Sequence, residues 1–145
     1  MSVAFQLWCD GSAAPNPGPM GLGVIVIEPD GTEHSGSVLW PERGDNNVAE
    51  ALAVAEAVRR AVALGATDVV VHSDSDVVVR LLRHEREPTR VEALAAAIAA
   101  AEAALASVTS SFVLVTRRRN SRADALARSA VGLLPKAPKK KAQRR

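Results

Sequence analysis

Short apolar runs and longer alanine-rich segments alternate along the chain, separated by clusters of Gly, Pro, Asn, Asp and Ser. The short runs, rich in β-branched residues and bounded by turn residues, predict strands at residues 3–9, 23–28, 32–39, 68–73 and 111–116. The longer segments, with apolar residues at helical spacing, predict helices at residues 47–64, 76–83, 91–106 and 121–133. Early strands followed by alternating helices and strands predict an α/β fold, a five-stranded mixed sheet with helices on both faces.

Two segments between the early strands are rich in turn residues. Residues 12–19 contain several prolines and a glycine, which predict a loop without regular structure. The run Pro29-Asp30-Gly31 predicts the turn of a hairpin. The strand at residues 68–73 is rich in valine, and this composition predicts burial on both faces of the sheet.

The length and composition predict one domain with a core of small aliphatic residues. Of 145 residues, 48% are hydrophobic and only 3% are aromatic, so Ala, Val and Leu must fill the core. The single cysteine, Cys9, excludes a disulfide within the chain and predicts a buried strand thiol. We find neither a signal peptide nor an apolar stretch long enough to cross a membrane, and we therefore expect a cytoplasmic monomer.

The formal net charge of +2 is unevenly distributed along the chain. Residues 135–145 contain six basic residues and no acidic one, which leaves 12 basic against 16 acidic residues before them. We therefore expect a domain over residues 1–134 with a net charge near −4, followed by a basic, disordered tail over residues 135–145. A negative body is an unusual partner for nucleic acid, and the tail or bound cations would offset its charge.

Four carboxylates, each in a short motif, are the strongest candidates for chemistry. Asp10 and Asp74 follow predicted strands, whereas Glu50 and Asp124 lie early in predicted helices. Converging carboxylates cannot all stay ionised at neutral pH without cations between them, and Mg²⁺ or Mn²⁺ suits an all-oxygen site. Two such ions can hold a phosphodiester, one activating water and the other stabilising the leaving oxygen. The four positions therefore predict a nuclease.

Each carboxylate also has a structural explanation. Asp10 could belong to an ordinary turn, Asp74 could cap the helix after it, and Glu50 and Asp124 could each complete a capping box. Placement favours chemistry, because the ends of strands, where we expect Asp10 and Asp74, form the ligand crevice of open α/β sheets. On a helical wheel Glu50 lies away from the solvent-exposed sector, and an acid on a protein-facing side requires a partner such as a metal ion.

The motifs around these acids resemble those of type 1 ribonucleases H over nearly the whole chain except the tail. The matching stretches are Asp10-Gly11-Ser12 with Asn16-Pro17-Gly18-Pro19 and Gly21, Asn47-x-x-Glu50, Ser73-Asp74-Ser75, and Asn120-x-x-Ala123-Asp124-x-Leu126-Ala127. The resemblance implies a ribonuclease H-like fold and a metal-dependent endonuclease. Such an enzyme hydrolyses the RNA strand of an RNA–DNA hybrid and leaves 5′-phosphate and 3′-hydroxyl ends.

The resemblance also implies roles for individual residues. The catalytic and metal-binding acids, which would hold two Mg²⁺ or Mn²⁺ ions, correspond to Asp10, Glu50, Asp74 and Asp124. The contacts to the substrate correspond to Gly11, Ser12, Asn16, Asn47 and Arg117. For the two asparagines, ordinary turn and cap roles are the alternative.

Several positions depart from the family pattern. Residues 116–120, before the last acid, lack the histidine that many bacterial members carry and resemble the short branch of the family. Asp45 stands where a phosphate-binding threonine is usual, and its carboxylate would repel phosphate but could cap the helix. Residues 83–90 are too few for the extra helix and basic protrusion of the larger bacterial form. The histidines match no motif, and we interpret them as structural or surface residues: His34, His72 and His84.

Two other functions are compatible with the same fold. A non-catalytic module could bind hybrids or double-stranded RNA, although a pure binder has no use for four acids that face a phosphate. A 3′–5′ exonuclease of the same superfamily usually has Asp-x-Glu in its first strand, where this chain has Asp10-Gly11-Ser12. The site residues, rather than the fold, separate these functions.

Overall fold

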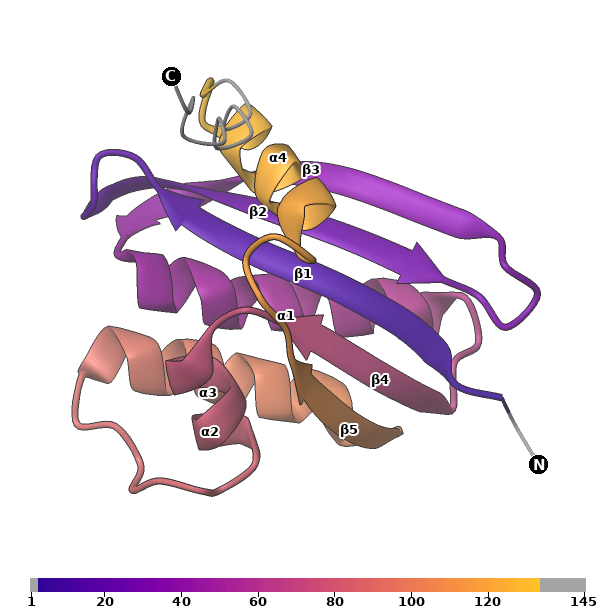
Figure 1. Cartoon of the computed structure of the whole chain (residues 1–145). Coiled ribbons are helices and arrows are strands. Elements are labelled where there is room, and N and C mark those ends of the chain that lie inside the picture. The colour runs from indigo at the N-terminus through magenta and orange to yellow at the C-terminus, as the bar shows by residue number, and fades with distance from the viewer. Residues whose placement is uncertain (1–2, 134–145) are drawn as a thin grey trace, which may run out of the picture.

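The computed structural model describes residues 3–133, which form five strands and four helices (Figure 1). The strands are β1 (Phe5–Ala13), β2 (Gly18–Ile27), β3 (Glu33–Gly44), β4 (Asp68–Ser73) and β5 (Thr109–Leu114). The helices are α1 (Asn46–Ala63), α2 (Asp76–Leu82), α3 (Glu92–Leu105) and α4 (Ser121–Ala130). None of these helices has the length and apolar character needed to span a bilayer. The predicted basic tail, residues 135–145, lies outside the described residues.

The strands of the described chain form one mixed sheet, as predicted, and their order is β3-β2-β1-β4-β5. β1, β2 and β3 pair antiparallel, whereas β4 runs parallel to both β1 and β5. β1 pairs with β4 only from Phe5 to Trp8, but it pairs with β2 as far as Ala13. The last residues of β1 therefore have β2 as their partner and no strand on the β4 side.

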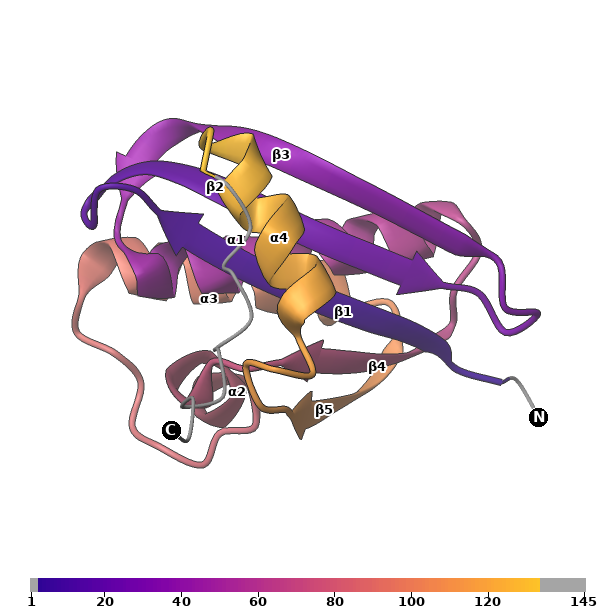
Figure 2. The same ribbon diagram turned by 45° about the horizontal axis from the view of Figure 1, so that its top comes forward.

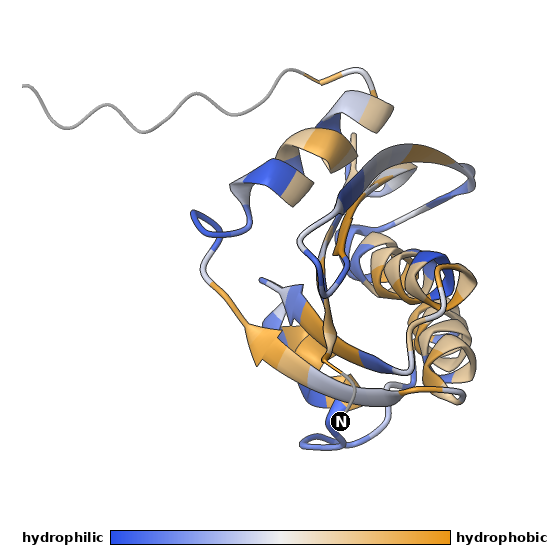
Figure 3. Ribbon diagram, turned by 90° about the vertical axis from the view of Figure 1, so that its right-hand side faces the viewer, coloured by the Kyte–Doolittle hydropathy of each residue, from blue (hydrophilic) through white to orange (hydrophobic). Residues whose placement is uncertain are grey.

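Helices cover both faces of the sheet, which confirms the predicted architecture. α1 and α3 lie side by side on one face, and α4 lies across β2 and β1 on the other (Figure 3). The core between the sheet, α1 and α3 consists mainly of Ala, Val and Leu, and its largest fully buried side chains include Leu7, Leu22, Val54 and Val58. Cys9 is buried in this core, as predicted.

Glycines of β2 let α4 approach the sheet closely. A Cβ at Gly23 would lie 2.1 Å from the carbonyl oxygen of Ala123, and Gly21 meets α4 in the same way. Without these side chains the helix backbone can lie directly on β2 (Figure 2). The Ser37 hydroxyl of β3 also donates to the Leu126 carbonyl at 2.7 Å, which holds α4 across the strands.

The first hairpin is longer than the sequence predicts. β1 continues to Ala13 and β2 begins at Gly18, so the turn is much shorter than the loop predicted for residues 12–19. The cause is strand pairing, because the antiparallel ladder extends to the pair of Ala13 with Met20. The predicted position of Asp10 at the end of a strand is therefore wrong, and Asp10 lies within β1.

Two predictions about the other strands are also corrected. β5 begins and ends two residues earlier than predicted, because it pairs in parallel with the whole of β4. Burial along β4 alternates instead of covering both faces: Val69 and Val71 are buried, but Val70 between them is only half-buried. The reason is that α4 covers β1, β2 and β3 and leaves the same face of β4 uncovered.

Candidate active site

Three of the four predicted acids meet where β1 and β4 separate. Asp10 of β1, Glu50 of α1 and Asp74, which directly follows β4, each offer a carboxylate oxygen, and these oxygens lie within 4.8 Å of one another. Elements that are distant in sequence therefore bring like charges into one small volume. Such a group could hold a metal ion.

Asp10 reaches this point because β4 has ended. It pairs with Gly23 of β2, and its side chain is only 4% exposed. Trp8, two residues earlier on the same face of β1, is the last residue that pairs with β4. Beyond Trp8 no strand separates Asp10 from Asp74, so the sheet topology itself creates the site.

A close approach of α1 to β1 positions Glu50. A Cβ at Gly11 would lie 2.1 Å from the backbone carbon of Ala49, so a glycine is required at this contact. The Glu50 carboxylate accepts a hydrogen bond from the Gly11 backbone. Its Oε2 is buried and has no hydrogen-bond partner within residues 3–133. The prediction that Glu50 points away from solvent is confirmed.

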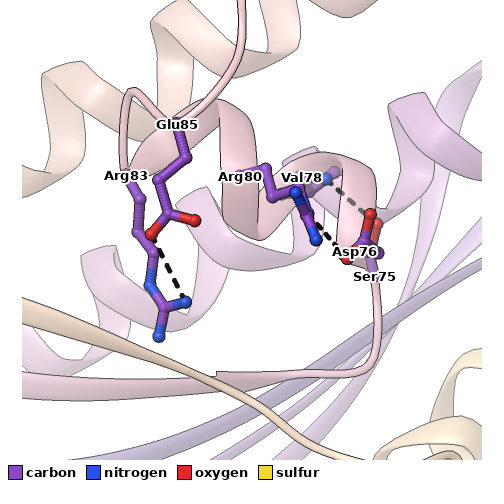
Figure 4. Close-up of polar contacts among 6 residues, drawn as sticks. All are labelled: Ser75, Asp76, Val78, Arg80, Arg83 and Glu85. Carbon is purple, nitrogen blue, oxygen red and sulfur yellow. Dashed lines mark hydrogen bonds and ion pairs between the residues drawn. The ribbon is translucent and has the colours of Figure 1, made fainter.

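The capping explanations for three of the acids are wrong. Asp45 caps α1, where its Oδ1 accepts a backbone N–H of the first turn at 2.9 Å. Ser75 caps α2 in the same manner at 3.2 Å (Figure 4), so Asp74 precedes the cap and does not form it. α4 has no side-chain cap hydrogen bond, which excludes a capping box completed by Asp124. None of these three acids therefore caps its helix.

Burial and like charges change the ionisation of the group. Burial raises the pKa of Asp10 to about 7, a hydrogen bond from Glu50 lowers it in part, and the charges of Asp74 and Asp124 raise it. Burial and the same hydrogen bond raise the pKa of Glu50 well above its ordinary value. Without a metal, the Glu50 carboxyl therefore holds a proton that it donates towards Asp10.

Asp124 lies beside this group and not within it. It is half-buried in the first turn of α4. A hydrogen bond with Asp124 and the charge of Asp124 both raise the pKa of Asp10, so the two carboxyl groups are close. Its oxygens are not among the mutually close ligand atoms of Asp10, Glu50 and Asp74. The structure thus joins three of the predicted acids in one group and sets the fourth next to Asp10.

The donor set fits a hard divalent cation. The ligand atoms are carboxylate oxygens, the donors that Mg²⁺ and Mn²⁺ prefer. A cation would supply the missing partner of Glu50 Oε2 and would offset the cost of burying several acids together. The residues present therefore suit the kind of ion that the sequence predicts.

Asn120 contacts this site, and sequence reasoning missed its role. It is 1% exposed, and its Nδ2 donates to the Cys9 carbonyl at 2.9 Å and to Asp74 Oδ2 at 3.4 Å. It thereby joins β1, the end of β4 and the start of α4. The motif that contains Asn120 and Asp124 indicated that Asn120 lies near the site. Only the folded structure shows that its amide contacts the strands and not its own helix.

Asparagines tie the first hairpin to α1. Asn16 Oδ1 accepts from the Asn46 backbone N–H at 3.1 Å, and Asn46 Oδ1 accepts from the Ala13 backbone N–H at 2.8 Å. The Asn16 contact is the structural role that the sequence left as an alternative. Asn47 is exposed in the first turn of α1, and its side chain makes no hydrogen bond within the described chain. Substrate binding by Asn16 and Asn47 stays a prediction.

The remaining predicted substrate contacts lie in β1 and in the loop before α4. Gly11 is buried and donates its backbone N–H to Glu50, whereas Ser12 is half-buried in the ladder between β1 and β2. Arg117 is exposed in the loop before α4. Gly11 thus adjoins the carboxylate group through Glu50, and the roles of all three residues in substrate binding stay predictions.

The histidines lie outside the carboxylate group, as predicted. His34 pairs with Glu28 at 2.6 Å, and His72 stacks on Trp8 with ring centroids 4.1 Å apart. His84 is exposed after α2. The segment between α2 and α3 contains no further helix, in agreement with the length argument.

The family model described as reverse transcriptase-like matches residues 8–130. The chain is similar to RNase H1 of the halophilic archaeon Halobacterium salinarum, with 29% identity and a TM-score of 0.79, covering 90% of this chain and 98% of that one. It is also similar to the N-terminal RNase H domain of a Mycobacterium tuberculosis protein, with 30% identity, a TM-score of 0.77, and coverage of 88% and 98%.

A third similar structure is LC11-RNase H1, a protein isolated from compost by a metagenomic approach and solved in complex with an RNA/DNA hybrid. In that complex the identity is 27% and the TM-score 0.75, with coverage of 88% of this chain and 96% of the other. A comparison with curated proteins found no match.

Proposed function

The chain belongs to the reverse transcriptase-like family and has the fold of type 1 ribonucleases H, and from this we propose that it is a metal-dependent endonuclease. It hydrolyses the RNA strand of RNA–DNA hybrids. Attack of water on phosphorus breaks the bond to the 3′ oxygen, which leaves a 5′-phosphate and a 3′-hydroxyl. We further propose that the enzyme acts as a cytoplasmic monomer, with residues 1–134 as the catalytic domain.

The observation that carries this proposal is the convergence of Asp10, Glu50 and Asp74 within 4.8 Å. A protein gains no stability from buried carboxylates that must share protons, so their retention calls for a functional reason. Two divalent ions would be held by Asp10 together with its acidic neighbours, one among the three grouped acids and one on the side of Asp124. Bound Mg²⁺ or Mn²⁺ supplies an activated water and stabilises the leaving oxygen.

The chain's own residues would orient the substrate around this point. Glu50 contacts the 2′-hydroxyl next to the scissile phosphate, the group that distinguishes RNA from DNA. Backbone groups of Gly11 and Ser12, with the side chains of Asn16 and Asn47, contact the minor groove. A loop arginine, Arg117, contacts the phosphate backbone near the scissile bond. The complex of LC11-RNase H1 with an RNA/DNA hybrid supports this substrate class.

Cleavage of an end-labelled RNA–DNA hybrid tests the proposal. We expect cutting of the RNA strand with Mg²⁺ or Mn²⁺, none with a chelator, and none of single-stranded RNA or duplex DNA. The products should be ligatable through their 5′-phosphate and extendable by a polymerase from their 3′-hydroxyl. Tight hybrid binding without cutting under either metal would favour the non-catalytic binding module instead.

A further inference from the structure

A small hollow lies beside the carboxylate group, on the face of the sheet that α4 only partly covers. Its volume is about 240 Å³, and residues from β1, β2 and the start of α4 line it, among them Trp8, Ile25, Ile27, Arg119, Asn120 and Arg122. Trp8 lies two residues before Asp10 on the same face of β1, and Asn120 donates to Asp74. The hollow therefore shares its lining residues Trp8 and Asn120 with the surroundings of the acids.

One wall of the hollow is aromatic. Trp8 stacks on His72 with an interplanar angle of 8°, and both rings are half-buried because α4 does not extend over β4. His72 does not line the hollow, so the hollow meets a part of the indole that the imidazole leaves uncovered. The neighbouring isoleucines complete an apolar floor on which a flat ring could lie.

The rim of the hollow is basic. Arg122 makes two contacts with Glu33, at 2.8 and 3.3 Å, whereas the exposed Arg119 forms no salt bridge within residues 3–133. Arg119 is the last of three consecutive arginines in the loop before α4. Its charge is therefore available to an anion next to the aromatic wall.

The aromatic wall and the basic rim together match two parts of a nucleotide. Trp8 offers a ring against which a base can stack, and the exposed Arg119 offers a positive charge to the phosphate beside that base.

We propose that this hollow binds an unpaired nucleobase from a single-stranded extension of the hybrid. The base stacks against Trp8, and an adjacent phosphate contacts Arg119. Stacking of this kind tolerates every base, so the hollow would favour extended substrates without reading their sequence. The inference rests on the proposed function, since it assumes that the hybrid occupies the neighbouring acids.

Equilibrium binding to two hybrids tests the proposal, using the full chain with Asp74→Asn to prevent cleavage. One hybrid is blunt, and the other carries a short single-stranded RNA extension. Base stacking predicts a gain of about fivefold or more for the extended hybrid. Trp8→Leu and Arg119→Ala should each abolish that ratio, whereas Arg59→Ala, which removes an exposed arginine from α1, should preserve it. Equal affinity for both hybrids, or a ratio that survives Trp8→Leu and Arg119→Ala, would overturn the proposal.

A second measurement separates this inference from the proposed function. In a Trp40→Phe variant Trp8 is the only tryptophan, so its fluorescence reports on the hollow when a single-stranded RNA oligonucleotide is added. We expect quenching that Arg119→Ala weakens. If the blunt hybrid is neither bound nor cut, the proposed function fails, but the hollow is still judged by this titration, and absence of quenching refutes it.

Discussion

Asp10 and Glu50 share a proton in the interior, next to further carboxylates, and this arrangement costs folding free energy. Burial is the largest cause of the raised pKa of both groups. Glu50 Oε2 has no hydrogen-bond partner in the described chain that would offset this cost. The cost is therefore best explained by a ligand, and a cation is the one that these oxygens suit.

The raised pKa of Asp10 predicts how stability depends on pH without metal. The folded protein keeps a proton up to about pH 7, whereas the unfolded chain releases it near the ordinary value of 3.8. The protonated Asp10 therefore contributes fully to the free energy of unfolding below pH 3.8. This contribution, about 4 kcal/mol at most, is lost as the pH rises towards 7. Urea unfolding in chelator at pH 5 and pH 7.5 measures the loss.

Two controls make this test specific. Asp10→Asn removes one titrating group and should reduce the dependence. Glu50, whose pKa burial also raises, keeps a fall in the same direction, and His72, whose pKa burial lowers, acts in the opposite direction. Added Mg²⁺ should restore stability mainly at the higher pH, because the metal replaces the proton. An equal loss of stability in Asp10→Asn would show that the dependence arises elsewhere.

Asn120 is predicted to position Asp74 for metal binding. Asn120→Leu keeps most of the side-chain volume but removes the Nδ2 donor that bridges Cys9 and Asp74. Loss of such a supporting hydrogen bond typically weakens metal affinity about 10- to 100-fold. Mn²⁺ binding followed by electron paramagnetic resonance measures this effect without relying on activity.

The matched control for Asn120→Leu is Ser37→Ala. It removes another hydrogen bond that holds α4, the one to Leu126, without touching the acids. We expect it to change the melting temperature but not the Mn²⁺ affinity. An unchanged Mn²⁺ affinity in Asn120→Leu would show that Asn120 stabilises the fold but does not position Asp74 for metal binding.

Individual elements position the site through close backbone contacts. α1 approaches β1 at Gly11, and α4 approaches β2 at Gly21 and Gly23. These contacts fix both helices from opposite faces of the sheet, and each helix carries an acid in its first turns. The separation of β1 from β4 then leaves room for the side chains to meet.

Gly11→Ala is predicted to disturb both the fold and the site. The new Cβ would lie 2.1 Å from Ala49 backbone, so α1 must move, which costs about 1–3 kcal/mol or more and displaces Glu50. Gly36→Ala is the matched control, because its Cβ would meet only the flexible end of Arg60. Urea unfolding and Mn²⁺ affinity of both variants check the prediction, and equal effects in the two would contradict it.

The sequence predicts the elements far better than their ends. Apolar periodicity and turn residues located every strand and helix, but the extension of β1 to Ala13 depends on pairing with β2, which no local pattern reveals. The four acids were found through motif order, yet the split between three grouped acids and Asp124 is a tertiary property. The bonds of Asn120 reach residues 111 and 46 positions away, beyond the reach of local patterns.

The whole molecule combines a negative body with a basic tail. Residues 1–134 have a net charge near −4, while residues 135–145 contribute six positive charges. Cations bound by the acids would reduce the repulsion of a nucleic acid near the site, and the arginines before α4 add a local positive charge. Binding to a hybrid should therefore depend on salt through more than one part of the chain.

Deletion of residues 135–145 is predicted to weaken hybrid binding. The slope of log affinity against log salt should become shallower by about 1 for each basic residue that contacts a phosphate. Fluorescence anisotropy of the full and shortened chains, both with Asp74→Asn, measures the slopes over a salt series. An unchanged slope would exclude the tail as a phosphate contact and leave it a solubilising segment.

The most direct test of the central claim compares the full chain with its Asp74→Asn variant on an end-labelled RNA–DNA hybrid. The substitution keeps the shape of the side chain but removes the charge that should hold a metal. We predict Mg²⁺- or Mn²⁺-dependent cutting of the RNA strand by the unaltered chain, and near-complete loss in Asp74→Asn at an unchanged melting temperature. Cleavage that survives in Asp74→Asn would contradict the assignment of the carboxylate group as the catalytic metal site.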